Sequence, residues 1–155
     1  MNTRHLTHAG FESLVFTPTG GDSADLDDVL RATVPLVQRD PNVRVWSVYS
    51  LWAVGKPGTD VNVLQLEHDV NNAANGLQLT LHEIERLLDS LRQVVDVIII
   101  AAASNAELPE RTALNANAAK YQTKIELIDS TSVVVSTRSR VVAAALIAEL
   151  GFTGG

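Results

Sequence analysis

Acidic and amide side chains gather between residues 60 and 69, and these residue types could do metal chemistry. The segment 61–66 follows a turn at 56–59 and predicts a strand. Gln65 and Glu67, two positions apart, would then share one strand face, with Asp60 where the strand begins. Carboxylate and amide oxygens are ligands that Mg²⁺ and Mn²⁺ prefer. The pattern makes Asp60, Gln65, Glu67 and His68 candidate catalytic residues, and Asp60 and Glu67 candidate metal ligands. The alternative is an exposed strand end whose polar groups are only solvated.

A glycine-containing turn before the first predicted helix is the candidate phosphate site. Gly20, Gly21 and Ser23 could offer backbone N–H groups to an anion at a helix N-terminus. The spacing matches neither a Walker loop nor a dinucleotide fingerprint, and no lysine follows. Asp22 and Asp25 would also repel phosphate. An ordinary capped turn is the competing interpretation.

Two tryptophans and one tyrosine share a predicted strand, 43–54. Because strand side chains alternate, Trp46 and Trp52 are expected on one face and Tyr49 on the other. Core packing accounts for such aromatic residues. They would act as interface anchors only where they are exposed.

Other elements follow from hydrophobic periodicity and from helix start and stop signals. Thr80 with Glu83 predicts a capping box, and Gly151 predicts a left-handed helix end. The predicted elements, in chain order, are a strand at 12–16, a helix at 25–39 that contains Pro35, strands at 43–54 and 61–66, a helix from 81, a strand at 97–101, a helix at 109–121, a strand at 125–128 and a helix at 139–150.

This order predicts one α/β domain, residues 1–155. The later β-α-β units imply parallel strands joined by right-handed crossovers. The apolar run 97–101 is typical of a central parallel strand. Strands 43–54 and 61–66 would form an antiparallel hairpin. The expected architecture is three-layered, with a mixed, mostly parallel sheet and helices on both faces.

The stretch 65–135 resembles the C-terminal half of the Mrr-type restriction-endonuclease-like domain. Three sequence segments carry the resemblance, with a helix before the second and another before the third: the polar strand end 64–68, the apolar strand 96–104, and the strand with a closing acid at 125–129. With the preceding helix and strand, the match could cover residues 26–135. The resemblance implies this restriction-endonuclease-like fold and a metal-dependent phosphodiesterase site.

Carried onto this chain, the resemblance makes Asp60 the first metal ligand and Gln65 the second. Glu67 then occupies the position of the lysine that activates the attacking water. A carboxylate cannot supply that positive charge, and His68 is expected on the opposite strand face. The resemblance therefore implies a catalytically degraded nuclease fold.

Composition narrows the classes of partner. The net charge is −6 and only 12 residues are basic, which argues against nucleic-acid binding and favours a basic protein partner. The absence of cysteine excludes disulfides and thiolate chemistry. No signal peptide and no apolar run of membrane length is visible, so a cytoplasmic location is expected. An apolar helix face with Val141, Ala145 and Ala148, or a free strand edge, could support self-association.

These observations predict a non-catalytic α/β interaction module, such as an immunity, regulatory or defence-associated protein. It would act through contacts with a protein partner or through self-association as a homo-oligomer. One alternative is a metal-dependent nuclease, the only reading that needs Mg²⁺ or Mn²⁺. The other is a phosphate-ligand binder that uses the turn at Gly20 and Gly21. No other cofactor is expected.

Overall fold

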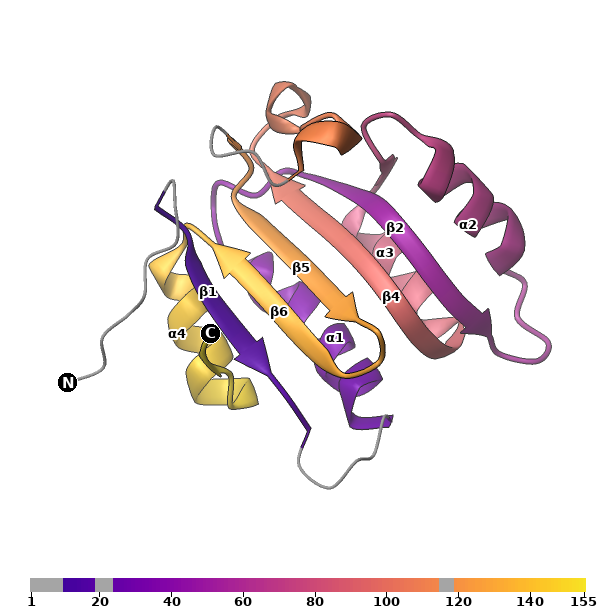
Figure 1. Ribbon diagram of the computed structural model, residues 1–155, viewed down its shortest axis with the longest axis horizontal. Helices are drawn as coiled ribbons and strands as arrows, with labels where there is room; N and C mark the ends of the chain where they lie inside the picture. Colours follow the sequence, from indigo (N-terminus) through magenta and orange to yellow (C-terminus); the bar gives the residue numbers. More distant parts are fainter. Residues whose placement is uncertain (1–9, 19–23, 115–118) are drawn as a thin grey trace.

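One seven-stranded sheet organises the chain in the computed structural model, which describes residues 10–18, 24–114 and 119–155. Every pair of neighbouring strands is antiparallel, in the order β3-β2-β4-β5-β6-β1-β7 (Figure 1). The strands are β1 (Glu12–Phe16), β2 (Val45–Gly55), β3 (Leu77–Leu79), β4 (Leu91–Ala102), β5 (Thr123–Ile128), β6 (Ser132–Thr137) and β7 (Thr153–Gly154).

Three helices cover one face of this sheet. α1 (Ala24–Val37), α3 (Leu81–Asp89) and α4 (Arg140–Leu150) lie behind the sheet in Figure 1. α2 (Val63–Asn72) instead runs along the outside of β2. The prediction of a mostly parallel sheet with helices on both faces is therefore wrong. No helix in the described ranges is long and apolar enough to cross a membrane.

The unbroken apolar run in β4 was the reason for predicting a parallel strand, and that prediction is wrong. β4 lies between β2 and β5, so it is an interior strand as expected, but it is antiparallel to both. Val97 and Ile99 point into the core beneath the helices. Ile100 and Ala102 belong to a second apolar cluster on the other face, together with Leu108, Ala119 and Tyr121. Burial on both sides explains the apolar run without parallel neighbours.

Strand β6 has no counterpart among the predicted elements. It pairs with β5 through a tight turn in which Asp129 and Ser130 have φ values of 47° and 53°. Ile128 pairs with Ser132, so residues 129–131 form the loop, and tight hairpin turns with positive φ are usually marked in the sequence by Asn-Gly or Asp-Gly. Because this turn contains no glycine, the sequence did not predict the hairpin or the antiparallel direction of β6.

Two predicted elements have a different structure. Residues 61–66 do not form a strand, because α2 begins at Val63, where Asn62 accepts a hydrogen bond from the Gln65 amide at 3.1 Å. The buried residues of α2, Val63 and Val70, are seven apart, which is two helical turns. The helix predicted at 109–121 is only a 3₁₀ turn, Arg111–Ala113, within the described residues.

The capped helices agree with their sequence signals. Thr80 Oγ1 accepts from the Glu83 amide and Glu83 Oε1 accepts from the Thr80 amide, both at 3.1 Å, which confirms the capping box of α3. Gly151 ends α4 with φ 76°. α1 continues through Pro35 to Val37, and it buries Leu26 and Leu30 in the core.

Candidate interaction surface

The described residues cover the sheet face opposite the helices only in part. Residues 103–114 and 119–122 lie over one end of this face (Figure 1), and their apolar side chains Leu108, Ala119 and Tyr121 pack against it. On the remainder of this face, the register of the strands places a row of partly exposed or exposed side chains side by side. We call this remainder the open face, and it is formed by Val15, Ser50, Trp52, Asp96, Ile98, Glu126, Ile128 and Val134.

A β-bulge in β2 places Trp52 on the open face. Val48 pairs with Ile99 and Ser50 pairs with Ile98, so Tyr49 is an extra residue without a partner in β4. The extra residue reverses the alternation of side chains beyond it.

The bulge therefore separates the two tryptophans. Trp46 lies on the helix-covered face and is 2% exposed, whereas Trp52 lies on the open face and is 53% exposed. The expectation that both share one face is wrong. Period-two alternation holds only along a regular strand, and nothing local in the sequence marks the bulge.

Arg111 and Tyr49 hold the bulge in place. The Tyr49 hydroxyl donates to the Pro109 carbonyl at 2.6 Å, and Arg111 Nη1 donates to the Tyr49 carbonyl. Burial raises the pKa of Tyr49 to about 12, so its hydroxyl keeps the proton that it donates. Arg111 Nη2 also donates to the carbonyls of Val70 and Ala73 at the C-terminus of α2. One guanidinium thus ties the bulge to α2.

The turn between β5 and β6 fixes Asp96 beside Trp52. The Asp129 amide donates to Asp96 Oδ1 at 2.8 Å. The Ser130 amide donates to the Val95 carbonyl at 2.9 Å, and its hydroxyl donates to the Val94 carbonyl at 3.1 Å. Asp96 is the residue paired with Trp52 across β4 and β2. The pair therefore places a carboxylate next to an exposed indole.

The charge of the open face is negative. Lys124 and Glu126 on β5 form an ion pair at 2.7 Å. Among the described residues, no cation forms an ion pair with Asp96 or with Asp129 in the adjoining turn. The face thus combines apolar side chains with carboxylates that lack a cationic partner.

The edge of β2 beside this face is closed by α2. Asn71 accepts from the Leu51 amide at 3.2 Å and donates to the Leu51 carbonyl at 2.9 Å. Glu67 Oε1 accepts from the Ala53 amide at 2.8 Å. These side chains occupy backbone groups that could otherwise pair with a foreign strand. The open face, rather than this part of the edge, is left for contacts.

The predicted metal site is not assembled. Asp60 forms an ion pair with Arg86, Gln65 donates to Asp69 on the same helix at 2.9 Å, and Glu67 serves the β2 edge. His68 is exposed and lies against Asn72 one turn further along α2. Within the described ranges, no group of three or more His, Cys, Asp or Glu side chains could hold a metal ion. The strand geometry that would have brought these residues together does not exist, because Gln65, Glu67 and His68 lie on α2 and Asp60 lies in the bend before it.

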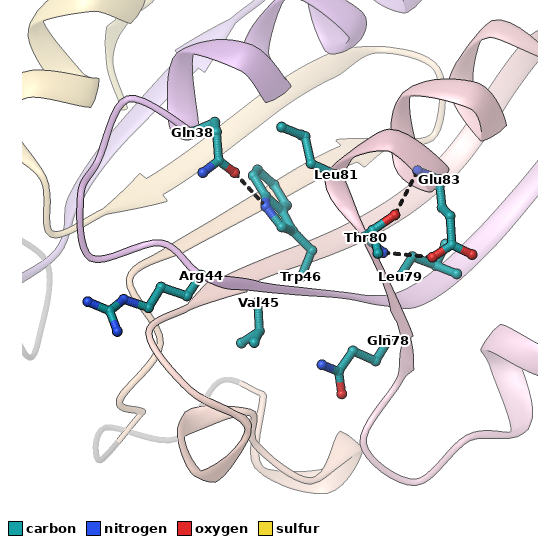
Figure 2. A pocket seen from close by; sticks show the side chains of 9 residues that line it. All are labelled: Gln38, Arg44, Val45, Trp46, Gln78, Leu79, Thr80, Leu81 and Glu83. Carbon is teal, nitrogen blue, oxygen red and sulfur yellow. Dashed lines mark hydrogen bonds between the residues drawn. The ribbon is translucent and has the colours of Figure 1, made fainter.

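The phosphate-site residues Gly20, Gly21 and Ser23 lie outside the described residues. A groove of about 620 Å³ lies elsewhere, at the junction between β3 and α3. Figure 2 shows Gln38, Trp46 and Leu81 on one side of β2, and Val45 and Gln78 on the other. The lining residues are Gln38, Arg44, Val45, Trp46, Gln78, Leu79, Thr80, Leu81 and Glu83.

Most polar groups of the groove already have partners. Trp46 Nε1 donates to Gln38 Oε1 at 2.9 Å, and Thr80 and Glu83 are used in the capping box (Figure 2). Arg44 is the lining cation, and it forms no ion pair within the described part of the chain. One cation in an open groove does not indicate which ligand would bind there. The open face is therefore the stronger candidate for a functional site.

Comparison with known proteins found no match: no family model fits the chain, and no curated protein or solved structure is significantly similar to it.

Proposed function

We propose that this protein is a non-catalytic interaction module that binds a protein partner through its open face, with Trp52 as the anchor. The observation that carries the proposal is the 53% exposure of Trp52 on a strand whose other tryptophan is buried. Water contact of an indole is unfavourable by about 25 cal/mol per Å² of apolar surface. A partner that covers Trp52 would recover that free energy.

The surroundings of Trp52 have the composition of an interface centre. Ile98 on β4 and Ile128 on β5 add apolar surface, which Val134 extends to β6, while Ser50 and Asp96 supply polar groups. Tryptophan is enriched among the residues that dominate binding energy. The antiparallel sheet holds these side chains on a rigid frame, which reduces the entropy lost on binding.

The polar residues that suggested catalysis support the same proposal. Asp60 forms an exposed ion pair with Arg86, and Glu67 accepts from the Ala53 amide at the edge of β2. A carboxylate that closes a strand edge is not free to hold a metal ion. The interaction surface therefore accounts for more of the observed geometry than a phosphodiesterase site does.

Site-specific photo-crosslinking in the cells that produce the protein tests this proposal. A benzophenone amino acid would replace Trp52 in one variant and Val141 in the other. Val141 is a matched control because it is 60% exposed but lies on α4, in the helix layer. We expect discrete adducts from position 52 and none of the same mass from position 141.

The mass of the adduct identifies the class of partner. An adduct of twice the chain mass that contains only this sequence indicates self-association through the open face, and any other discrete mass indicates a different protein. Identical adducts from both positions, or adducts from position 141 alone, would contradict the proposal. The second result would assign the contact to the helix face of Val141, Ala145 and Ala148.

A further inference from the structure

We propose that Trp52 and Asp96 together form a receptor for an arginine side chain presented by a basic segment of the partner protein. This inference rests on the proposed function and names the chemistry that the open face recognises. Its central observation is the juxtaposition of an exposed indole with a carboxylate on the neighbouring strand.

Strand geometry brings the two groups within reach of one ligand. Trp52 and Asp96 are directly paired across β2 and β4. The Cβ atoms of such pairs are about 4.5–5.5 Å apart. A guanidinium placed over the indole can therefore donate hydrogen bonds to the carboxylate beside it. The indole face attracts the cation and the carboxylate neutralises it.

The carboxylate is pre-organised for this contact. Asp96 Oδ1 is occupied by the Asp129 amide at 2.8 Å, which fixes the orientation of the group. No described residue bonds to Asp96 Oδ2. The turn that supplies the amide is itself anchored on β4 through Ser130. Asp96 Oδ2 is thus already positioned to accept a hydrogen bond, and the carboxylate needs no rearrangement when a donor binds.

Charge complementarity identifies the occupant as basic. Asp96 and Asp129 have no cationic partner among the described residues, and Lys124, two positions before Glu126 on β5, is paired with Glu126. The whole chain carries a net charge of −6. An acidic or neutral partner would leave these carboxylates unmatched against an apolar contact.

Arginine fits this pair better than lysine does. The guanidinium is planar, so it can stack on the indole while its edge donates to the carboxylate. An ammonium group can satisfy one of these contacts well but cannot stack. We therefore expect selectivity for arginine over lysine, in addition to the selectivity for positive charge.

Nuclear magnetic resonance of the full ¹⁵N-labelled chain provides the test. The probe is a capped peptide, acetyl-Gly-Arg-Gly-Arg-Gly-amide, compared with peptides that carry citrulline or lysine in place of arginine. Citrulline has the same shape but no charge. The indole N–H signal of Trp52 reports binding, while that of Trp46, bonded to Gln38, is the internal reference.

We expect the arginine peptide to shift the Trp52 signal saturably and to leave the Trp46 signal in place. The lysine peptide should bind at least threefold more weakly, and the citrulline peptide should cause no shift. Raising sodium chloride from 50 to 300 mM should weaken binding severalfold, because exposed charges are screened.

Variants separate the receptor from general attraction. Asp96→Asn keeps the acceptor for the Asp129 amide, and Trp52→Leu keeps apolar bulk without an aromatic face. Followed by the backbone amide of Ile98, each should raise Kd at least fivefold, whereas Trp52→Phe should retain most binding. Glu85→Gln and Val141→Ala, exposed changes on α3 and α4, should alter Kd less than twofold.

Two results would overturn the inference. One is a peptide that shifts signals near Glu85 as strongly as those of the open face, which would indicate unspecific attraction. The other is equal binding of the arginine and citrulline peptides. If position 52 still forms discrete crosslinks in that case, the interaction surface stands and only its arginine specificity falls.

Discussion

Trp46 and Trp52 lie six positions apart on β2 and point to opposite faces of the sheet, because the bulge at Tyr49 inserts one residue between them. Without that residue, Trp52 would face the helix layer together with Trp46. The bulge therefore exposes an aromatic anchor that a regular strand would bury. Arg111, which binds the carbonyl of the bulged residue, controls the same feature from outside the strand.

Replacing Arg111 by alanine should destabilise the protein by about 2 kcal/mol, since hydrogen bonds to a charged group contribute roughly 1.5–3 kcal/mol. The change removes the guanidinium donor from the carbonyls of Tyr49, Val70 and Ala73, and the last two keep only the backbone amides of Ala73 and Gly76. Urea unfolding at neutral pH measures the effect. Arg92→Ala, at an exposed position, is the control. Equal midpoints for the two variants would show that Arg111 does not hold the bulge.

Asn71→Asp should cost about 1–3 kcal/mol, because the new carboxylate cannot donate to the Leu51 carbonyl and stands beside an unmet acceptor. Glu67→Gln is the matched control, since glutamine keeps an oxygen that can accept from the Ala53 amide. Calorimetric melting compares the two. An Asn71→Asp protein that melts with the wild type would argue that α2 does not close the edge of β2.

The sequence was most informative where structure is determined locally. The capping box of Thr80 and Glu83, the end of α4 at Gly151 and the burial of β4 could all be predicted, because each depends on residues close together in the chain. The antiparallel order could not, since the hairpin at Asp129 and Ser130 lacks the usual glycine.

The candidate surface was harder to predict than the fold elements. Its anchor depends on a bulge held by a side chain 62 residues away, Arg111. Its carboxylate, Asp96, is oriented by a turn 33 residues away. Alternation along the strand carried no sign of either contact. The aromatic residues of the strand were the only sequence signal for this surface. The structure was needed to show which tryptophan is exposed.

Removing the cap of α3 by Thr80→Ala should lower stability by about 1 kcal/mol, the usual effect of losing an N-cap side chain. The substitution deletes the acceptor for the Glu83 amide. Thr80→Ser keeps the hydroxyl and should stay close to the wild type. The midpoint of urea unfolding separates the variants. No difference between alanine and serine would mean that the capping box adds nothing to stability.

Asp27→Asn should become relatively more stabilising as pH rises. Burial raises the pKa of Asp27, while the Val94 amide, which donates to its carboxylate, opposes the shift. An acid with a raised folded-state pKa favours the protonated native protein, so wild-type stability falls as pH rises from the unfolded value of 3.8 through the folded one. Asparagine keeps the acceptor but does not ionise.

The measurement is the unfolding free energy of both proteins at pH 3 and pH 7. The difference should shift in favour of the asparagine variant at pH 7. A difference that is independent of pH, or that moves toward the wild type, would contradict the assigned role of burial at Asp27.

The exposure of Trp52 in solution tests the central claim most directly. Trp46→Phe leaves Trp52 as the sole tryptophan, and Trp52→Phe leaves Trp46, which is buried and bonded to Gln38. Acrylamide quenching of each single-tryptophan protein compares the two sites. The account expects red-shifted, readily quenched emission from Trp52 and blue-shifted, protected emission from Trp46. Equally protected emission from both would show that the open face is covered in the isolated protein, and would contradict its role as a free interaction surface.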